Sequence, residues 1–175
     1  MLEKLAPDFF VRSVYDLDLD TLSAKGIRAI ITDLDNTLVS WDDPLPNAGL
    51  QDWLKIVRGK GFSVYIVSNN SPERVRKFAK AFGVPAISKA VKPRRRAFRL
   101  ACEEMGVTLA ETAVIGDQIF TDVLGGNRLG VYTILVNPVS RREFFGTKIM
   151  RKLEGLILRQ LNRRGLLKGP GNNSK

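Results

Sequence analysis

The chain has 175 residues, enough for one domain with a full hydrophobic core and too few for two domains of ordinary size. Its formal net charge is +10 and it contains no histidine, which excludes histidine phosphotransfer, His-based triads and His-ligated zinc. The single Cys102 cannot form an internal disulfide, and the first ten residues carry charges where a secretion signal needs an apolar segment, so we expect a reducing, cytoplasmic location.

Four short apolar runs rich in branched residues alternate along the chain with segments of helical periodicity. Such runs are typical of strands that are buried on both faces of a parallel sheet. The expected strands are 29–34, 63–67, 113–115 and 133–136. The first expected helix is 50–60. The second begins at Pro72, with Ser71 as its N-cap, and ends at Gly83; the third, 94–105, begins after Pro93 and ends at Gly106. The alternation predicts a three-layer α/β/α domain of Rossmann-like type, in which binding groups gather at the carboxyl ends of the strands.

Two acidic side chains follow the first expected strand. The segment ITDLDNTL (31–38) places Asp33 and Asp35 where the apolar run ends, so both carboxylates can face one polar pocket. Two such carboxylates repel each other unless a cation lies between them, and Mg²⁺ also binds phosphate oxygens. The pattern therefore favours phosphoryl transfer. The alternative is a solvated loop in which Asp35 and Asn36 form a turn.

A second acidic pair follows the third expected strand, in the segment VIGDQIFTD (114–122). Asp117 is placed to complete a metal site with Asp33 and Asp35, and Asp122 is placed to support that site from behind. The alternative for Asp117 is that it caps the following helix.

Two further segments carry groups that suit a phosphate ligand. In VSNNS (67–71), the Ser68 hydroxyl and the adjoining backbone N–H groups lie between a strand and a helix N-terminus, although the same pattern is also typical of an ordinary capped turn. In KAVKPRRR (89–96), Lys92 can neutralise the charge that builds on a transferring phosphoryl group. Lys89 is the competing candidate, and a solvated basic surface is the alternative to both.

These four segments, in this order, resemble the haloacid dehalogenase superfamily over about residues 25–140. The resemblance implies a Mg²⁺-dependent phosphatase in which Asp33 is the nucleophile and forms an aspartyl-phosphate, while Asp35 acts first as an acid and then as a base. The implied metal ligands are Asp33, Asp35 and Asp117. Thr37 is implied to brace the loop and to belong with Ser68 and Asn69 to the phosphate site, and Lys92 to screen charge.

The spacing of the motifs leaves no room for an inserted cap domain, which members of this superfamily use to select small substrates. Asp35 and Ser68 are 33 residues apart, a distance that one flap-like loop (40–47), one helix and one strand account for, and Ser68 and Lys92 are 24 residues apart. We therefore expect an open site that accepts a phosphate displayed on something large, such as a lipid headgroup, a protein or a nucleic acid end.

The C-terminal part of the chain is its most basic part. Residues 141–175 hold ten Lys or Arg and two Glu, a net charge of +8, so the phosphatase core with its N-terminal extension (1–140) carries only +2. Apolar residues from 147 to 164 recur at helical spacing, which predicts a basic amphipathic helix within 141–167, and we expect disorder in 168–175. The helix either packs on the sheet or binds an anionic bilayer. RNA binding is less favoured because residues 147–164 contain no aromatic residue for base stacking.

The segment PDFFVRSVY (7–15), the lack of room for a cap and the segment GGNRLGVYTILVNP (125–138) are similar to the YqeG-like branch, which is related to mitochondrial phosphatidylglycerophosphatases. The similarity implies dephosphorylation of phosphatidylglycerophosphate to phosphatidylglycerol. No apolar run approaches the roughly 18 residues of a membrane-spanning helix, so we expect any contact with the inner face of the membrane to be peripheral. Two alternatives stay open: a phosphatase of a nucleotide, sugar phosphate or phosphoprotein, and a non-catalytic protein that binds RNA or ribosomes.

Overall fold

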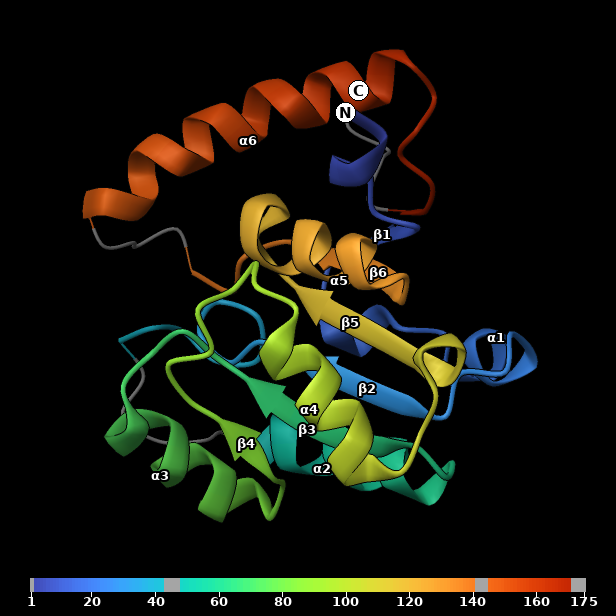
Figure 1. Ribbon diagram of the computed structural model, residues 1–175, viewed down its shortest axis with the longest axis vertical. Helices are drawn as coiled ribbons and strands as arrows, with labels where there is room; N and C mark the ends of the chain where they lie inside the picture. Colours follow the sequence, from blue (N-terminus) through green and yellow to red (C-terminus); the bar gives the residue numbers. More distant parts are fainter. Residues whose placement is uncertain (1, 43–47, 141–144, 171–175) are drawn as a thin grey trace.

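The computed structural model describes residues 2–42, 48–140 and 145–170, with the backbone alone at 145–149 and 151, and within them six parallel strands form one sheet. The strand order is β1-β6-β5-β2-β3-β4, so β5 and β2 are neighbours at the centre (Figure 1). The strands are β1 (Phe9–Val11), β2 (Ala29–Thr32), β3 (Ser63–Val67), β4 (Ala86–Ile87), β5 (Thr112–Gly116) and β6 (Tyr132–Val136).

Helices cover both faces of this sheet. One face packs against α1 (Leu19–Ala24), α2 (Ala48–Gly59) and α3 (Pro72–Phe82), and the other packs against α4 (Arg96–Met105), α5 (Leu124–Leu129) and, toward β1, α6 (Phe145–Arg163). Shorter turns are η1 (Leu2–Leu5), η2 (Val14–Asp16), η3 (Leu109–Glu111) and a π-helical turn, η4 (Ile119–Val123). Successive strand residues enter opposite cores: Ile30 lies in the first and Ile31 in the second. Burial on both faces explains why the strands are continuously apolar.

The predicted three-layer α/β/α fold is confirmed. Helix α3 begins and ends as expected, because the Ser71 hydroxyl accepts the N–H of Arg74 (3.4 Å) and Gly83 ends the helix in the left-handed region at φ +62°. Helix α4 begins at Arg96 rather than directly after Pro93, without a side-chain cap. Two edge strands, β1 and β4, were not predicted, since three and two residues are too short to show a pattern.

No domain is inserted between β2 and β3, or between β3 and β5, in the part of the chain that the structure describes. The first interval holds α2 and the second holds α3, β4, α4 and η3. Residues 43–47 of the expected flap-like loop lie outside the described residues. The described elements therefore agree with a phosphatase core that has no cap.

Helix α6 lies across the β1-β6 side of the molecule, next to the N-terminal turn (Figure 1). Its Leu161 is fully buried in a cluster with Phe10 and Ile119. The chain beyond α6 also returns to this edge, since the carbonyl of Lys168 accepts the N–H of Phe10 (2.7 Å). The side chains of 148, 149 and 151, on which part of the amphipathic prediction rests, and residues 171–175 of the expected disordered tail lie outside the described residues.

Candidate active site

Three acidic side chains meet at the carboxyl ends of the two central strands. Asp33 follows β2 and Asp117 follows β5, and the N–H of Asp33 donates to the carbonyl of Ile115 (2.9 Å), which ties the two strand ends together. Asp122 reaches the same place from η4. One carboxylate oxygen of each acidic residue lies within 4.8 Å of those of the other two. The topology thus assembles a carboxylate cluster from two distant motifs.

A glycine allows Asp122 to fold back onto the end of β5. A Cβ atom at Gly116 would lie 2.2 Å from Cγ of Asp122, so no larger residue fits there without a shift. Two hydrogen bonds then hold the carboxylate in place. Oδ2 of Asp122 accepts the N–H of Gln118 (3.3 Å) and the hydroxyl of Thr121 (3.1 Å). Asp122 is thereby held in its position by its own turn, and it is only 1% exposed.

A buried lysine links two of the three carboxylates. Nζ of Lys92 lies 2.7 Å from Oδ1 of Asp33 and 2.7 Å from Oδ1 of Asp122. The amide of Asn69 holds the backbone of Lys92, because its Oδ1 accepts the Lys92 N–H at 2.7 Å. Lys89, the other candidate in this segment, is exposed. The structure therefore places Lys92, and not Lys89, beside the expected nucleophile.

The charges of this cluster favour a divalent cation. When all four groups are ionised, three negative charges and one positive charge give a net −2. Burial raises the pKa of Asp33 above its ordinary value; Lys92 opposes this rise, while Asp122 and Asp117 add to it. Burial disfavours the charged form of Lys92, but Asp122 and Asp33 raise its pKa overall. Carboxylate oxygens are ligands that Mg²⁺ prefers, and a divalent ion would balance the net charge, so these residues fit such a metal.

Asp35 lies on the other side of the pocket. Its Oδ1 accepts Nε–H of Arg74 (2.6 Å) and its Oδ2 accepts the amide of Asn70 (2.8 Å). The side chain is 18% exposed, more than those of the cluster. The Asp35 carboxylate, which was predicted as the third metal ligand, therefore lies outside the carboxylate cluster, and Asp122, which was predicted only to support the site, lies within it.

The remaining predicted site residues have different surroundings. Thr37 is 2% exposed and its hydroxyl donates to Oδ1 of Asp117 (3.0 Å), so it braces an acidic residue and does not line the pocket. Ser68 lines the pocket, and its Oγ accepts the N–H of Asn70 (3.1 Å). Asn69 also lines the pocket while it holds the backbone of Lys92.

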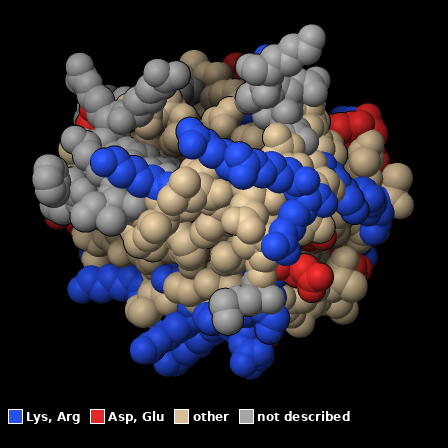
Figure 2. Space-filling view, turned by 90° about the horizontal axis from the view of Figure 1, so that it is seen from above, with Lys and Arg blue, Asp and Glu red and all other residues tan. Residues whose placement is uncertain are grey.

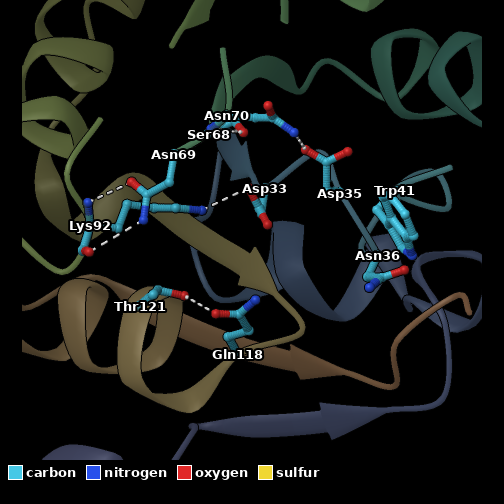
Figure 3. Close-up of a pocket in the computed structure, with 10 residues that line it drawn as sticks. All are labelled: Asp33, Asp35, Asn36, Trp41, Ser68, Asn69, Asn70, Lys92, Gln118 and Thr121. Carbon is cyan, nitrogen blue, oxygen red and sulfur yellow. Dashed lines mark hydrogen bonds and ion pairs between the residues drawn. The ribbon is translucent and has the colours of Figure 1, made fainter. Parts of the chain in front are cut away.

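Asp33, Asp35 and Lys92 line a pocket of about 500 Å³ together with polar side chains that include Ser68 and Asn69 (Figure 3). In Figure 3, Asp33 projects into the pocket between Lys92 on one side and Asp35 on the other. The residues that line the pocket are Asp33, Asp35, Asn36, Trp41, Ser68, Asn69, Asn70, Lys92, Gln118 and Thr121. The sequence analysis missed Trp41, Gln118 and Thr121, which no local pattern singles out. It also missed Arg74, because nothing in the local sequence around an arginine on a helix indicates that it pairs with a residue as distant in the chain as Asp35.

Comparisons with known proteins agree with this fold. The family model of the haloacid dehalogenase-like hydrolases matches residues 7–130. The "Probable phosphatase YqeG" of Bacillus subtilis (strain 168) is 44% identical over 166 residues, which cover 94% of this chain and 96% of that protein. The "Phosphatidylglycerophosphate phosphatase 1, chloroplastic/mitochondrial" of Arabidopsis thaliana is 29% identical over 173 residues, which cover 91% of this chain and 49% of that protein. The solved structure of a HAD phosphatase from Thermococcus onnurineus shares the fold, with a TM-score of 0.52, 17% identity and coverage of 68% of this chain and 90% of that one.

The chain therefore belongs to the haloacid dehalogenase-like hydrolase family. Within this family it is an enzyme of the phosphatase type, and it carries a carboxylate cluster that could hold a divalent metal. The resemblance drawn from the four sequence motifs is confirmed.

Proposed function

We propose that this phosphatase is a Mg²⁺-dependent phosphomonoesterase that works through an aspartyl-phosphate on Asp33, and that its substrate is phosphatidylglycerophosphate. The observation that carries the catalytic part is the position of Asp33, which projects into the pocket between the buried ammonium of Lys92 and the carboxylate of Asp35 (Figure 3). Mg²⁺ bound by Asp33 and Asp117, with Asp122 beside them, would supply positive charge to the oxygens of the phosphoryl group.

The proposed chemistry uses two carboxylates in two roles. An oxygen of Asp33 attacks phosphorus, the ester P–O bond breaks, and the leaving oxygen keeps the electron pair and takes a proton from Asp35. A water molecule then gives a proton to Asp35, and the oxygen of this water attacks phosphorus. The bond between phosphorus and the Asp33 oxygen breaks, which releases inorganic phosphate. Lys92 stabilises negative charge near Asp33, and Arg74 stabilises the Asp35 carboxylate that forms in the first step.

The basic helix supports a substrate that lies in a bilayer. On α6, Met150, Leu153 and Leu156 are 41%, 46% and 59% exposed, although each is large and apolar. Exposed cationic side chains on the same helix are Lys152, Arg159 and Arg163. Figure 2 shows Lys and Arg side chains around an expanse of uncharged side chains on the face that carries α6. Apolar side chains flanked by cations suit the surface of an anionic bilayer.

The Arabidopsis relative, by its name, acts on phosphatidylglycerophosphate, and it aligns with 91% of this chain. No helix in the described part of the chain is long and apolar enough to cross a membrane. Because the exposed apolar and cationic side chains of α6 suit a lipid surface, we include in the proposal a peripheral position on the cytoplasmic face of the membrane, where α6 rests on the lipid and the uncapped pocket faces a headgroup.

Phosphate release from a substrate panel tests the proposal. The panel contains phosphatidylglycerophosphate in mixed micelles, nucleotides and sugar phosphates, each with Mg²⁺ and with EDTA. We expect phosphatidylglycerophosphate to be hydrolysed with the highest kcat/KM and EDTA to abolish release. Faster release from a soluble phosphate would overturn the lipid substrate while leaving the mechanism intact. No release from any ester, together with retained RNA or ribosome binding, would overturn the enzymatic proposal.

Two further measurements separate the parts of this proposal. Turnover in ¹⁸O-labelled water, stopped after less than one cycle, should place ¹⁸O in the released phosphate and none in Asp33, because water attacks phosphorus in the second step. Flotation with vesicles of anionic and of neutral lipid tests α6 independently. We expect binding to the anionic vesicles alone, and equal flotation with both would contradict the role given to the cationic side chains.

A further inference from the structure

A buried carboxylate on α6 contacts the loop that carries the acidic cluster. Glu154 is 4% exposed, and its Oε1 accepts the backbone N–H of Ile119 (2.7 Å) and of Phe120 (3.3 Å). These two residues begin η4, the turn that follows Asp117 and contains Asp122. The first N–H groups of a helical turn have no partner within the turn, so an external acceptor is needed wherever water is excluded. Glu154 is that acceptor.

The position of Glu154 in the chain makes this contact unexpected. It lies 32 residues after Asp122 and outside the segment that the family model matches, 7–130. A buried carboxylate is costly unless it is paired or hydrogen-bonded, and an apolar residue would join α6 to the core without that cost. The contact therefore has a more specific consequence than holding α6 on the sheet.

We infer that Glu154 is a positioning residue that sets the conformation of η4 and thereby keeps Asp122 within the carboxylate cluster. The chain of contacts is short. Glu154 accepts the first N–H groups of η4, and the Asp122 carboxylate accepts hydrogen bonds from Gln118, which directly precedes η4, and from Thr121 within it. Asp122 in turn holds Lys92 at 2.7 Å. Without Glu154, the start of η4 loses its acceptor and Asp122 loses its fixed place.

This inference rests on the proposed metal site and extends it, because it makes the C-terminal helix a part of the site. Residues that orient metal-binding groups from behind typically change metal affinity or activity by about 10- to 100-fold when they are removed. Glu154→Ala should therefore weaken Mg²⁺ binding by about that factor. Glu154→Gln should keep most of the affinity, because its amide oxygen still accepts the two N–H groups.

The test measures Mg²⁺ binding to the intact chain by calorimetry and amide hydrogen exchange at Ile119 and Phe120 in the metal-free protein. We expect Glu154→Ala to raise the Mg²⁺ dissociation constant and to speed exchange at both amides, and Glu154→Gln to restore both. The matched control is Leu22→Ala, in α1 on the opposite face of the sheet, which should lower Tm and leave Mg²⁺ binding unchanged.

An unchanged Mg²⁺ dissociation constant in Glu154→Ala, with a loss of Tm like that of Leu22→Ala, would overturn the inference and leave Glu154 as an anchor for α6. If Glu154→Ala does not fold, Glu154→Asp gives the same test, since it keeps the charge but is one methylene too short to reach η4. Neither readout needs turnover, so a failure of the proposed phosphatase reaction and a failure of this inference are distinguishable.

Discussion

The two sides of the pocket hold their charged groups in different ways. On the inner side, Asp33 and Lys92 line the pocket and Asp117 and Asp122 complete the carboxylate cluster; the side chains of Lys92 and Asp122 are each 2% exposed and share one ion pair. On the outer side, Asp35 and Trp41 line the pocket, and Asp35 forms an ion pair with Arg74 in which the two side chains are 18% and 19% exposed. Removing one partner of a fully buried pair leaves an uncompensated charge, whereas solvent screens a more exposed one. Removing Lys92, the cation that the inner carboxylates share, should therefore affect folding and catalysis together, whereas changes on the outer side should mainly affect catalysis.

The largest effect is expected from Asp33→Asn, an inner substitution that removes a charge without changing shape. Loss of the nucleophile should lower kcat by about 10⁴-fold or more. The fold should persist, because Lys92 keeps its ion pair with Asp122 and the buried position already disfavours a charge at residue 33. Phosphate release and thermal unfolding measure the two quantities. A variant that kept a tenth of the wild-type rate would remove Asp33 from the role of nucleophile.

Lys92→Met should lower both the stability of the fold and the rate of catalysis. The buried carboxylates of Asp33 and Asp122 lose their shared cation, which should lower the free energy of unfolding by about 3–5 kcal/mol. The rate should fall by about 10³-fold, because the charge near the transferring group is lost. Saturating Mg²⁺ should recover part of the stability and little of the rate. The control is Lys89→Met, whose exposed side chain should change neither quantity; equal effects of the two variants would contradict this account.

On the outer side, Asp35→Asn should separate catalysis from stability. We expect turnover of an alkyl phosphate to fall by about 10²- to 10³-fold, because the leaving oxygen loses its proton donor. The unfolding free energy should change by about 1 kcal/mol or less, since the pair with Arg74 is partly exposed. With p-nitrophenyl phosphate, whose leaving group needs no proton, a burst of nitrophenolate should precede a slow steady state. A loss of turnover on p-nitrophenyl phosphate without a burst of nitrophenolate would argue against Asp35 as the acid.

Gly116→Ala should give a smaller effect on the inner side. The new Cβ would lie 2.2 Å from Cγ of Asp122, so the Asp122 side chain must shift from the position in which it pairs with Lys92. We expect a loss of about 1–3 kcal/mol in unfolding free energy from the overpacking, and an activity about 10- to 100-fold lower. The matched control is Gly59→Ala in α2, which has nothing within 4 Å of its added Cβ and should be neutral or slightly stabilising. Wild-type activity in Gly116→Ala would show that the position of Asp122 is not critical.

Much of the inner side could be predicted from the sequence. Asp33 and Asp117 each follow an apolar run of branched residues, and the carboxyl ends of neighbouring parallel strands converge at one edge of the sheet. Placement at strand ends therefore predicted a contact between residues that are 84 positions apart. The same reasoning did not separate Asp35 from Asp122. Asn36 turns the chain at φ +62° just after Asp35, and no spacing rule states which carboxylate then faces the cluster.

By itself, the sequence determined the alternation of strands and helices, the limits of α3 and the placement of Asp33 and Asp117 beside each other, because periodicity, caps and strand ends are local signals. It left Lys92 and Lys89 as alternatives, and the fold decided between them. The tertiary structure alone decided which acidic residues share the cluster, that Arg74 pairs with Asp35, and that Glu154 caps η4. Each of these contacts joins residues from separate elements whose distance depends on how the helices pack on the sheet. Such contacts leave no periodic trace in the residues themselves, and therefore only the folded chain reveals them.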